Sequence, residues 1–303
     1  MNTSDPRHTV TGVNGEPKLS VVIPVFDEQD TIGECLARLT DQIDHIAEII
    51  VVDNNSTDAS MAIVGGRAEG HPEIRIIREP CQGLVFARNA GLDAATGELI
   101  ARIDADTRVG ARWAETIVDF FGSDIEHKWS ALCGRGEAYG VPLAGRFDRW
   151  KIKIHPLGRR RAHRTVTDIP VLYGSNMVVR RDTWERIRSR VSMRRDIFED
   201  VDMGLCITED GGRNAFLASL TVGVSARRME SGLPAFVKYM SFLPRTFALH
   251  RRFALTAGTA LVYVPALTVL HAVRLGAIRL YDGDTGRWSA RRVRRRSSDR
   301  VLP

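Results

Sequence analysis

The first 120 or so residues alternate between two hydrophobic periods. Short runs are almost continuously apolar and bounded by polar residues, which is typical of strands buried on both faces. These runs are Leu19–Val25, Glu48–Asp53, Ile74–Ile77 and Glu98–Ile103. Between them, apolar residues recur three or four positions apart, which indicates helices at about 32–39, 59–68, 83–95 and 112–121. This alternation predicts an α/β protein whose sheet is mainly parallel, with helices on both faces.

The following hundred residues are less regular. Strands are expected at Leu132–Tyr139, Val171–Val179 and Asn214–Val222, and a helical region at about 180–210. An arginine-rich loop, Gly158–Arg164, lies between the first two of these strands. Two interpretations of the loop stay open: a solvated surface, or a mobile lid that meets a donor diphosphate or a lipid phosphate.

A C-terminal hydrophobic segment, Phe253–Val273, has no Asp, Glu, Lys or Arg over 21 residues. That length is enough to span a bilayer. The segment nevertheless contains threonines, Pro265 and His271, and arginines flank both of its ends, so no inside–outside asymmetry is visible. Three alternatives follow: a single span, a helix or hairpin on the membrane surface, or a helix pair packed on the domain.

The net charge of +6 comes entirely from the tail Arg287–Pro303, and the rest of the chain is formally neutral. The tail is interpreted as a solvated arm or as an anchor for anionic lipid through Arg287–Arg300. Because Trp288 is its single aromatic residue and no recognition fold is visible, we expect no nucleic-acid partner. Four dispersed cysteines without a C-x-x-C pair favour reduced thiols in a cytoplasmic protein. Residues 1–17 are polar and are expected to form a flexible leader without a secretory signal.

Polar residues that follow the strands carry the chemistry, because ligands bind beyond the carboxyl ends of parallel strands. Asp104 and Asp106 directly follow the fourth strand, and their hard oxygen ligands suit Mg²⁺ or Mn²⁺ together with a substrate phosphate. The alternative is a solvated turn. Asp53 and Asn54, after the second strand, are candidates to bind a base or ribose, to form an Asx turn that caps the next helix, or to do both.

An acidic pair, Glu199 and Asp200, lies about 95 residues further on. Such a pair is usually solvated surface, but apolar Phe198 and Val201 flank it. A carboxylate there is a candidate general base for an attacking hydroxyl.

Four motifs occur together in this chain in a characteristic order. They are Ser20–Glu28, Ile49–Asp58, Gly83–Gly91 and Gly97–Asp106. In this order and spacing the chain closely resembles the family 2 glycosyltransferases, which have the GT-A fold, from about Leu19 to Phe121 and more loosely to Ala226. The resemblance implies a hexosyltransferase that moves a sugar from a nucleotide-diphosphate sugar to an acceptor hydroxyl, with inversion and with a divalent metal, Mg²⁺ or Mn²⁺.

The resemblance also implies a role for each matching residue. The donor-binding residues it implies are Pro24, Phe26, Glu28, Asp53, Asn54, Arg88, Asn89, Asp104 and Ala105. Asp106, with Asp104, is implied as the metal-binding residue. The residues implied on the acceptor side are Gly174, Ser175, Asn176 and Glu199. Asp200 is implied as the catalytic base.

The chain departs from the family pattern at several places. Asn54 stands where many members have Asp, and Phe26-Asp27 stands where many have Tyr-Asn. These departures leave the identity of the donor's nucleotide base open, with a UDP-sugar favoured. The Q-x-x-R-W motif of processive members is absent, and Leu243–Phe247 occupies that region, which predicts one sugar per encounter. The acceptor is open, and a lipid-linked one fits the hydrophobic C-terminal segment.

The expected organisation has four parts. A leader (1–17) precedes a GT-A domain (18–228), which divides into a nucleotide-sugar half (18–122) and an acceptor half (123–228); a helical segment (229–283) and a basic tail (284–303) follow. One alternative is a sugar nucleotidyltransferase, disfavoured because the loop after the first strand is acidic and lacks glycine. The other is a non-catalytic protein that uses the basic tail to bind membrane or nucleic acid. The expected location is the cytoplasm, with the cytoplasmic membrane face as the alternative.

Overall fold

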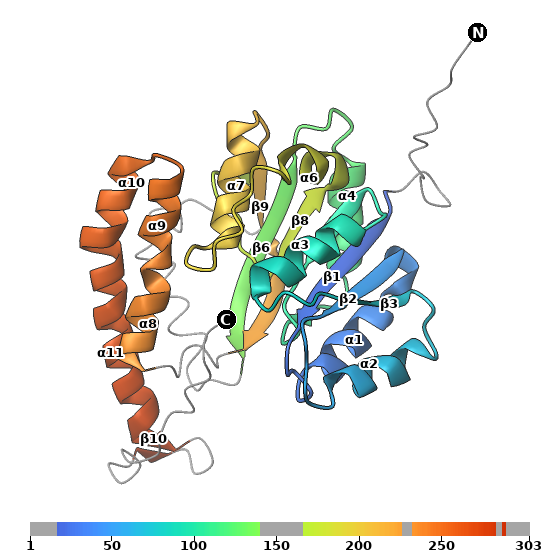
Figure 1. Ribbon diagram of the computed structural model, residues 1–303, viewed down its shortest axis with the longest axis horizontal. Coiled ribbons are helices and arrows are strands. Elements are labelled where there is room, and N and C mark those ends of the chain that lie inside the picture. The colour runs from blue at the N-terminus through green and yellow to red at the C-terminus, as the bar shows by residue number, and fades with distance from the viewer. Residues whose placement is uncertain (1–16, 140–165, 226–231, 283–286, 289–303) are drawn as a thin grey trace.

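The computed structural model describes residues 17–139, 166–225, 232–282 and 287–288. The leader 1–16, the arginine loop 158–164 and the tail beyond residue 288 lie outside the described residues. The centre of the fold is a nine-stranded sheet with the order β3-β2-β1-β4-β8-β6-β9-β5, and β7 pairs with β9 (Figure 1).

The first four strands form the parallel half of this sheet. They are β1 (Leu19–Val25), β2 (Glu48–Asp53), β3 (Ile74–Arg78) and β4 (Leu99–Arg102). All three pairings among them are parallel, with β1 between β2 and β4. The four predicted strands are confirmed; the apolar runs of β1, β2 and β4 are buried on both faces, whereas β3, at the edge of the sheet, is mostly exposed.

The other half of the sheet is mixed. Its strands are β5 (Arg108–Val109), β6 (Ala131–Tyr139), β7 (Val166–Ile169), β8 (Met177–Arg180) and β9 (Asn214–Ser225). β8 runs antiparallel to both β4 and β6, while β6 and β9 are parallel. The strand expected from Val171 begins only at Met177, because a turn with a hydrogen bond from the Asn176 N–H to the Tyr173 carbonyl precedes it. The predicted parallel arrangement therefore holds for the first half of the sheet, and the second half is mixed.

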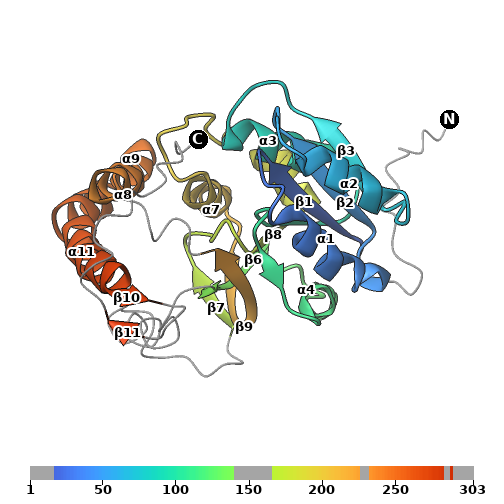
Figure 2. The same ribbon diagram turned by 90° about the horizontal axis from the view of Figure 1, so that it is seen from below.

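Helices cover both faces, and alternate strand residues face each layer. Val21 and Ile23 belong to the core beneath α1 (Ile32–Thr40), α2 (Ser60–Ala68) and α4 (Trp113–Gly122), whereas Val22 belongs to the core on the other face. That second layer contains α3 (Leu84–Ala94), α6 (Arg181–Ile187) and α7 (Glu199–Glu209). Figure 2 shows α1 and α4 on one side of the sheet and α3 on the other.

Close packing of α3 on β1 depends on Gly91. A Cβ atom at this position would lie 2.2 Å from a methyl group of Val22 and 3.0 Å from one of Val52. Any larger residue would push the helix away from the sheet. Gly91 therefore determines how close α3, and with it Arg88, lies to the strands.

The region 180–210 contains two helices, not the one helical region expected. α6 ends at Ile187, and α7 begins at Glu199 after an irregular stretch. The acidic pair Glu199-Asp200 consequently occupies the first turn of α7, where carboxylates are favoured by the helix dipole.

The C-terminal helices form a separate layer beyond α7 (Figures 1 and 2). α8 (Leu233–Met240) and α9 (Phe242–Leu249) are followed by α10 (Phe253–Gly258), which continues through a π-helical turn (Thr259–Tyr263) into α11 (Val264–Leu280). Phe236 of α8 stacks on His271 of α11, with ring centroids 4.0 Å apart. A short 3₁₀ turn (Ile43–His45) and a two-stranded hairpin, β10 (Tyr281–Asp282) with β11 (Arg287–Trp288), complete the described elements.

The long C-terminal helix has an apolar outer surface. Phe253–Gly276 is long and apolar enough to cross a membrane, and none of its most apolar window is buried by the rest of the protein. The large exposed side chains of this segment are Phe253, Leu255, Leu261, Val262, Tyr263, Val269 and Val273. The segment is thus one continuous helix rather than a helix pair, and its outer face has no cover within the described residues.

Candidate active site

An open cleft of about 210 Å³ lies between the α/β domain and the C-terminal helices. Its walls come from α3, the end of β4, the turn before β8, the residues leading into α7, and the junction of α8 and α9. Six residues predicted from the sequence line it together: Arg88, Asp104, Gly174, Ser175, Glu199 and Asp200. Residues far apart in the chain thus meet beyond the carboxyl end of β4, as the parallel half of the sheet predicts.

Two buried arginines share one carboxylate at the base of the cleft. Arg88 pairs with both Asp104, at 2.6 Å, and Glu199. Arg102, fully buried at the end of β4, lies 3.3 Å from the same Glu199 oxygen. Burial, reinforced by repulsion from Arg88, lowers the pKa of Arg102 to about 9. Glu199 was expected to contact the acceptor; in this structure it neutralises two guanidinium groups.

The candidate base Asp200 is held by the main chain. Its Oδ2 accepts a hydrogen bond of 2.7 Å from the Gly174 N–H, and its Oδ1 accepts one of 2.9 Å from the Val201 N–H. Arg102 in turn donates through Nε to the Gly174 carbonyl at 3.3 Å. These contacts fix the orientation of the carboxylate without engaging it in an ion pair within the described part of the chain.

Gly174 is required by this arrangement. A Cβ atom there would lie 2.2 Å from Arg102 Nη2 and 3.1 Å from Asp200 Oδ2. Separations below 3.0 Å are essentially never tolerated, so a side chain would displace the guanidinium. Gly174, which the resemblance placed on the acceptor side, thus also has a packing role, because it lets three elements approach one another.

Asn54 has an internal role, which corrects its expected place at the base. It is 3% exposed, and its Nδ2 donates to the carbonyls of Glu79 and Cys81. Its Oδ1 accepts from the Gly83 N–H at 2.8 Å. Since every polar atom of the amide already has a main-chain partner, Asn54 shapes the loop between β3 and α3.

Asn176 is likewise interior, which corrects its expected contact with an acceptor. It has no exposed surface; its Oδ1 accepts from Trp113 Nε1 at 3.0 Å, and its Nδ2 donates to the Leu220 carbonyl at 2.8 Å and to that of Arg135 at 3.4 Å. Ala105, expected at the donor, is 4% exposed and packs in the hydrophobic core, so only its main chain is available to a ligand.

The ends of β1 and β2 form the other part of the predicted donor site. Phe26 is 47% exposed, whereas Pro24 is buried within β1. Asp53 Oδ1 accepts from the Ser56 N–H at 2.9 Å, whereas the next helix has Ala59 as its N-cap and no side-chain cap. Glu28 accepts a hydrogen bond of 2.9 Å from the Thr31 hydroxyl. The structure brings these residues close along one edge, outside the cleft lining described above.

The pair Asp104 and Asp106 has the chemistry of a divalent-metal site. Both side chains are partly exposed, while Ala105 between them is buried. Two carboxylates supply hard oxygen ligands, and Mg²⁺ or Mn²⁺ characteristically takes its remaining ligands from water and a substrate phosphate. The residues present therefore fit such an ion.

Several cleft residues were missed from the sequence. Phe198, Tyr239 and Phe242 form an aromatic wall, with the rings of Phe198 and Tyr239 4.7 Å apart. Arg194 and Arg195 add cations at the rim. No local pattern in the sequence indicates the aromatic wall. The pair Arg194-Arg195, shortly before Glu199, could have been noticed in the sequence as a candidate anion contact.

Solved structures with this architecture define the class of protein. The mannosyltransferase PcManGT from Pyrobaculum calidifontis, solved with GDP-Man and Mn²⁺, matches with a TM-score of 0.62 at 20% identity over 90% of this chain and 78% of its own. S. aureus TarS with UDP-GlcNAc matches with a TM-score of 0.56 at 17% identity, over 80% and 73% of the two chains. At these identities the likeness establishes the fold, and the fold is that of the GT-A glycosyltransferases.

Sequence comparison then gives the family. The glycosyl transferase family 2 model matches residues 20–188, more than half of the chain, so the protein belongs to that family. The chain is 36% identical to the uncharacterized glycosyltransferase YibD of Escherichia coli, over 35% of this chain and 31% of YibD. It is 35% identical to the undecaprenyl-phosphate 4-deoxy-4-formamido-L-arabinose transferase of Sodalis glossinidius, over 36% of this chain and 35% of that enzyme. The matched part spans about a third of the length of these curated relatives.

Proposed function

We propose that this glycosyltransferase moves a single sugar from a nucleotide-diphosphate sugar to an acceptor hydroxyl, with inversion at the anomeric carbon. The observation that carries the proposal is the position of Asp200: a main-chain-oriented carboxylate in a cleft that also contains Arg88 and Asp104. A general base needs hydrogen-bond reach to the hydroxyl it deprotonates, and the cleft provides room for one.

Inversion is supported by the different surroundings of the two acidic residues that begin α7. Glu199 is occupied by Arg88 and Arg102, so Asp200 is the carboxylate left for the acceptor proton. One base and one displacement suffice when the hydroxyl attacks from the face opposite the leaving nucleotide. Arg195, in the cleft lining, supplies positive charge for the departing diphosphate, whereas Arg88 and Arg194 already pair with carboxylates of the protein.

A divalent metal is proposed at Asp104 and Asp106. When bound, it neutralises charge on the leaving diphosphate. Arg88 holds Asp104 Oδ1 at 2.6 Å and so fixes the direction of one ligand. Mn²⁺ in the PcManGT and GalNAc-T7 structures supports a divalent ion in this fold.

The donor we favour is a UDP-sugar. Phe26, half-exposed at the end of β1, is proposed to pack against the base, with Asp53 and Glu28 near the ribose. Because the Asn54 amide is fully occupied, base selection is assigned to the loops after β1 and β2. UDP-GlcNAc in TarS and GDP-Man in PcManGT support a nucleoside-diphosphate sugar as the donor. They leave uracil and guanine as the two bases to compare.

The acceptor we favour is lipid-linked, at the cytoplasmic face of a membrane. The aromatic wall of the cleft belongs to the same helical layer as the exposed apolar face of Phe253–Gly276. A lipid carrier lying along that face would present its head group to Asp200. The similarity to a transferase named for undecaprenyl phosphate supports this acceptor class.

The decisive experiment is calorimetric titration of the purified protein with UDP, GDP, CDP and dTDP, with and without Mn²⁺. We expect metal-dependent binding of one nucleotide, lost in Asp106→Ala. Asp200→Asn serves as the matched variant, because it should bind the nucleotide normally and lose transfer activity by about 10²–10⁴-fold. Absence of binding by every nucleotide, or a fully active Asp200→Asn variant, would overturn the proposal.

A further inference from the structure

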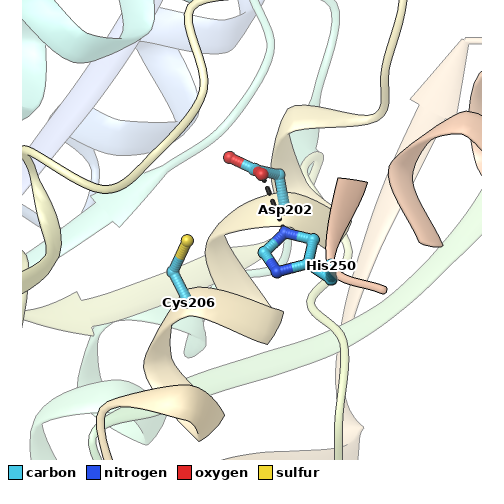
Figure 3. A group of neighbouring side chains, drawn as sticks. All are labelled: Asp202, Cys206 and His250. Carbon is cyan, nitrogen blue, oxygen red and sulfur yellow. Dashed lines mark hydrogen bonds and ion pairs between the residues drawn. The ribbon is translucent and has the colours of Figure 1, made fainter. Parts of the chain in front are cut away.

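Three potential metal ligands, two on α7 and one just after α9, converge outside the lining of the catalytic cleft (Figure 3). Asp202 and Cys206 lie one turn apart on the same face of α7, and His250 directly follows α9. Their ligand atoms all lie within 4.8 Å of one another. None of the three lines the cleft, and the proposed mechanism uses none of them.

The cluster is buried and polar. Asp202 is 1% exposed, Cys206 2%, and the side chain of His250 6%. Asp202 Oδ1 lies 2.9 Å from His250 Nε2, and its Oδ2 accepts from the Ser192 N–H at 2.8 Å. Burial, together with the carboxylates of Asp202 and Glu209, raises the pKa of Cys206 to about 12, so a metal-free protein keeps this thiol protonated.

A further carboxylate orients the histidine. Both oxygens of Glu209 lie 3.1 Å from His250 Nδ1. Nδ1 is therefore engaged, and Nε2 faces Asp202 (Figure 3). A carboxylate on the second ring nitrogen is the arrangement that accompanies metal-binding histidines, where it fixes the tautomer and increases ligand basicity.

We propose that Asp202, Cys206 and His250 bind Zn²⁺, with Glu209 as the outer-shell partner of the histidine. Oxygen, sulfur and nitrogen donors together suit Zn²⁺, whereas Mg²⁺ and Mn²⁺ prefer oxygen. Two ligands of one tetrahedral zinc lie roughly 3.5 Å apart, so side-chain shifts of about 1 Å close the site. It is separate from the all-oxygen pair Asp104 and Asp106 in both place and chemistry.

Metal binding here has a defined proton balance. Carboxylates face both nitrogens of His250. Zn²⁺ takes the place of the proton on Cys206 Sγ, and that proton goes to solvent. The product is a thiolate bound to zinc.

The consequence is a clamp between the catalytic helix and the C-terminal helices. α7 begins with the candidate base Asp200, and α9 begins with Phe242 in the cleft wall. A metal that joins Asp202 and Cys206 of α7 to His250 holds these two walls together. The same junction has further polar links, from the Phe198 N–H to the Thr246 hydroxyl at 2.9 Å, between Arg252 and Glu209 at 3.7 Å, and between Arg245 and Asp196 at 3.4 Å.

The test titrates the full-length, EDTA-stripped protein with Co²⁺ as a spectroscopic substitute for Zn²⁺. A thiolate ligand gives cobalt an intense ligand-to-metal charge-transfer band, which an all-oxygen site cannot produce. We expect this band at one equivalent in the wild type, in Cys81→Ser and in Asp106→Ala, and its disappearance in Cys206→Ser. Asp106→Ala removes the proposed donor metal, so failure of that site and failure of this one are distinguishable.

Two measurements on the wild type keep the proposal testable even if a variant folds poorly. Calorimetry in buffers of different ionisation enthalpy should show that the Cys206 thiol proton is released when Zn²⁺ binds, and saturating Zn²⁺ should raise Tm by about 5 °C. Glu209→Gln should lower Zn²⁺ affinity about 10–100-fold and keep the cobalt band. Absence of the band in the wild type, or an equal band in Cys206→Ser, would overturn the proposed site.

Discussion

Asn176→Ala tests whether the glycine-serine-asparagine segment before β8 contacts a ligand or supports the fold. The change removes two well-formed hydrogen bonds, from Trp113 Nε1 at 3.0 Å and to the Leu220 carbonyl at 2.8 Å. Both partners are buried with the amide, and each unsatisfied group costs about 1–3 kcal/mol. The third contact, to the Arg135 carbonyl at 3.4 Å, is too long to add much.

The expected loss is therefore about 4 kcal/mol in the free energy of unfolding, which corresponds to a fall in Tm of roughly 10 °C. Urea denaturation and a thermal scan measure these two quantities. A matched control is Gln29→Ala, since Gln29 is an exposed amide that accepts one hydrogen bond of 3.0 Å from the Ala59 N–H. That variant should lose less than about 1 kcal/mol.

The kinetic arm separates the two roles. Below its melting temperature, Asn176→Ala should retain the KM for donor and acceptor, because the side chain has no exposed surface. A stability loss under about 1 kcal/mol combined with a raised acceptor KM would refute the internal role and restore the acceptor contact.

Three further outcomes are expected. Gly174→Ala should lower kcat about 10²-fold with little change in nucleotide affinity, because its Cβ would displace Arg102 and shift Asp200; equal kcat would contradict the packing argument. With the pKa of Arg102 near 9, the rate should fall as pH rises through about 9, where Glu199 loses that cation, and Arg102→Met should lack this step in its profile. Between that pKa and the higher, ordinary pKa of an arginine, the unfolded chain binds more protons than the folded one, so this group's contribution to the unfolding free energy rises with pH. Iodoacetamide at neutral pH should label the exposed Cys81 and spare Cys35, because burial raises the pKa of the Cys35 thiol. Mass spectrometry of the labelled native protein measures the order of labelling, and labelling of Cys35 before Cys81 would contradict the prediction.

Much of the catalytic half could be predicted from local patterns. Apolar runs such as Leu19–Val25 become the parallel strands, because burial on both faces requires nearly continuous hydrophobicity. A parallel sheet directs its strand ends to one edge, so Asp104 was expected in a ligand site and lies in the cleft. The resemblance implied Asp200 as the base of an acidic pair flanked by apolar residues, and Asp200 too lines the cleft.

The direction of a side chain was the part that local patterns could not give. Asn54 and Asn176 stand in motifs typical of ligand contacts, yet both amides point inward to main-chain groups of other elements. Whether an amide meets a ligand or a distant carbonyl depends on partners tens of residues away. The same limit applies to Glu199, whose two arginines come from α3 and β4.

The sequence by itself determined the class of fold, the family and the edge of the sheet at which chemistry occurs, because each depends on periodicity and on short motifs. The tertiary structure alone decided the mixed half of the sheet, the aromatic wall of Phe198, Tyr239 and Phe242, and the cluster of Asp202, Cys206 and His250. These features join segments that are far apart in the chain. Their geometry follows from how helices pack on the sheet and on one another, which no local pattern encodes.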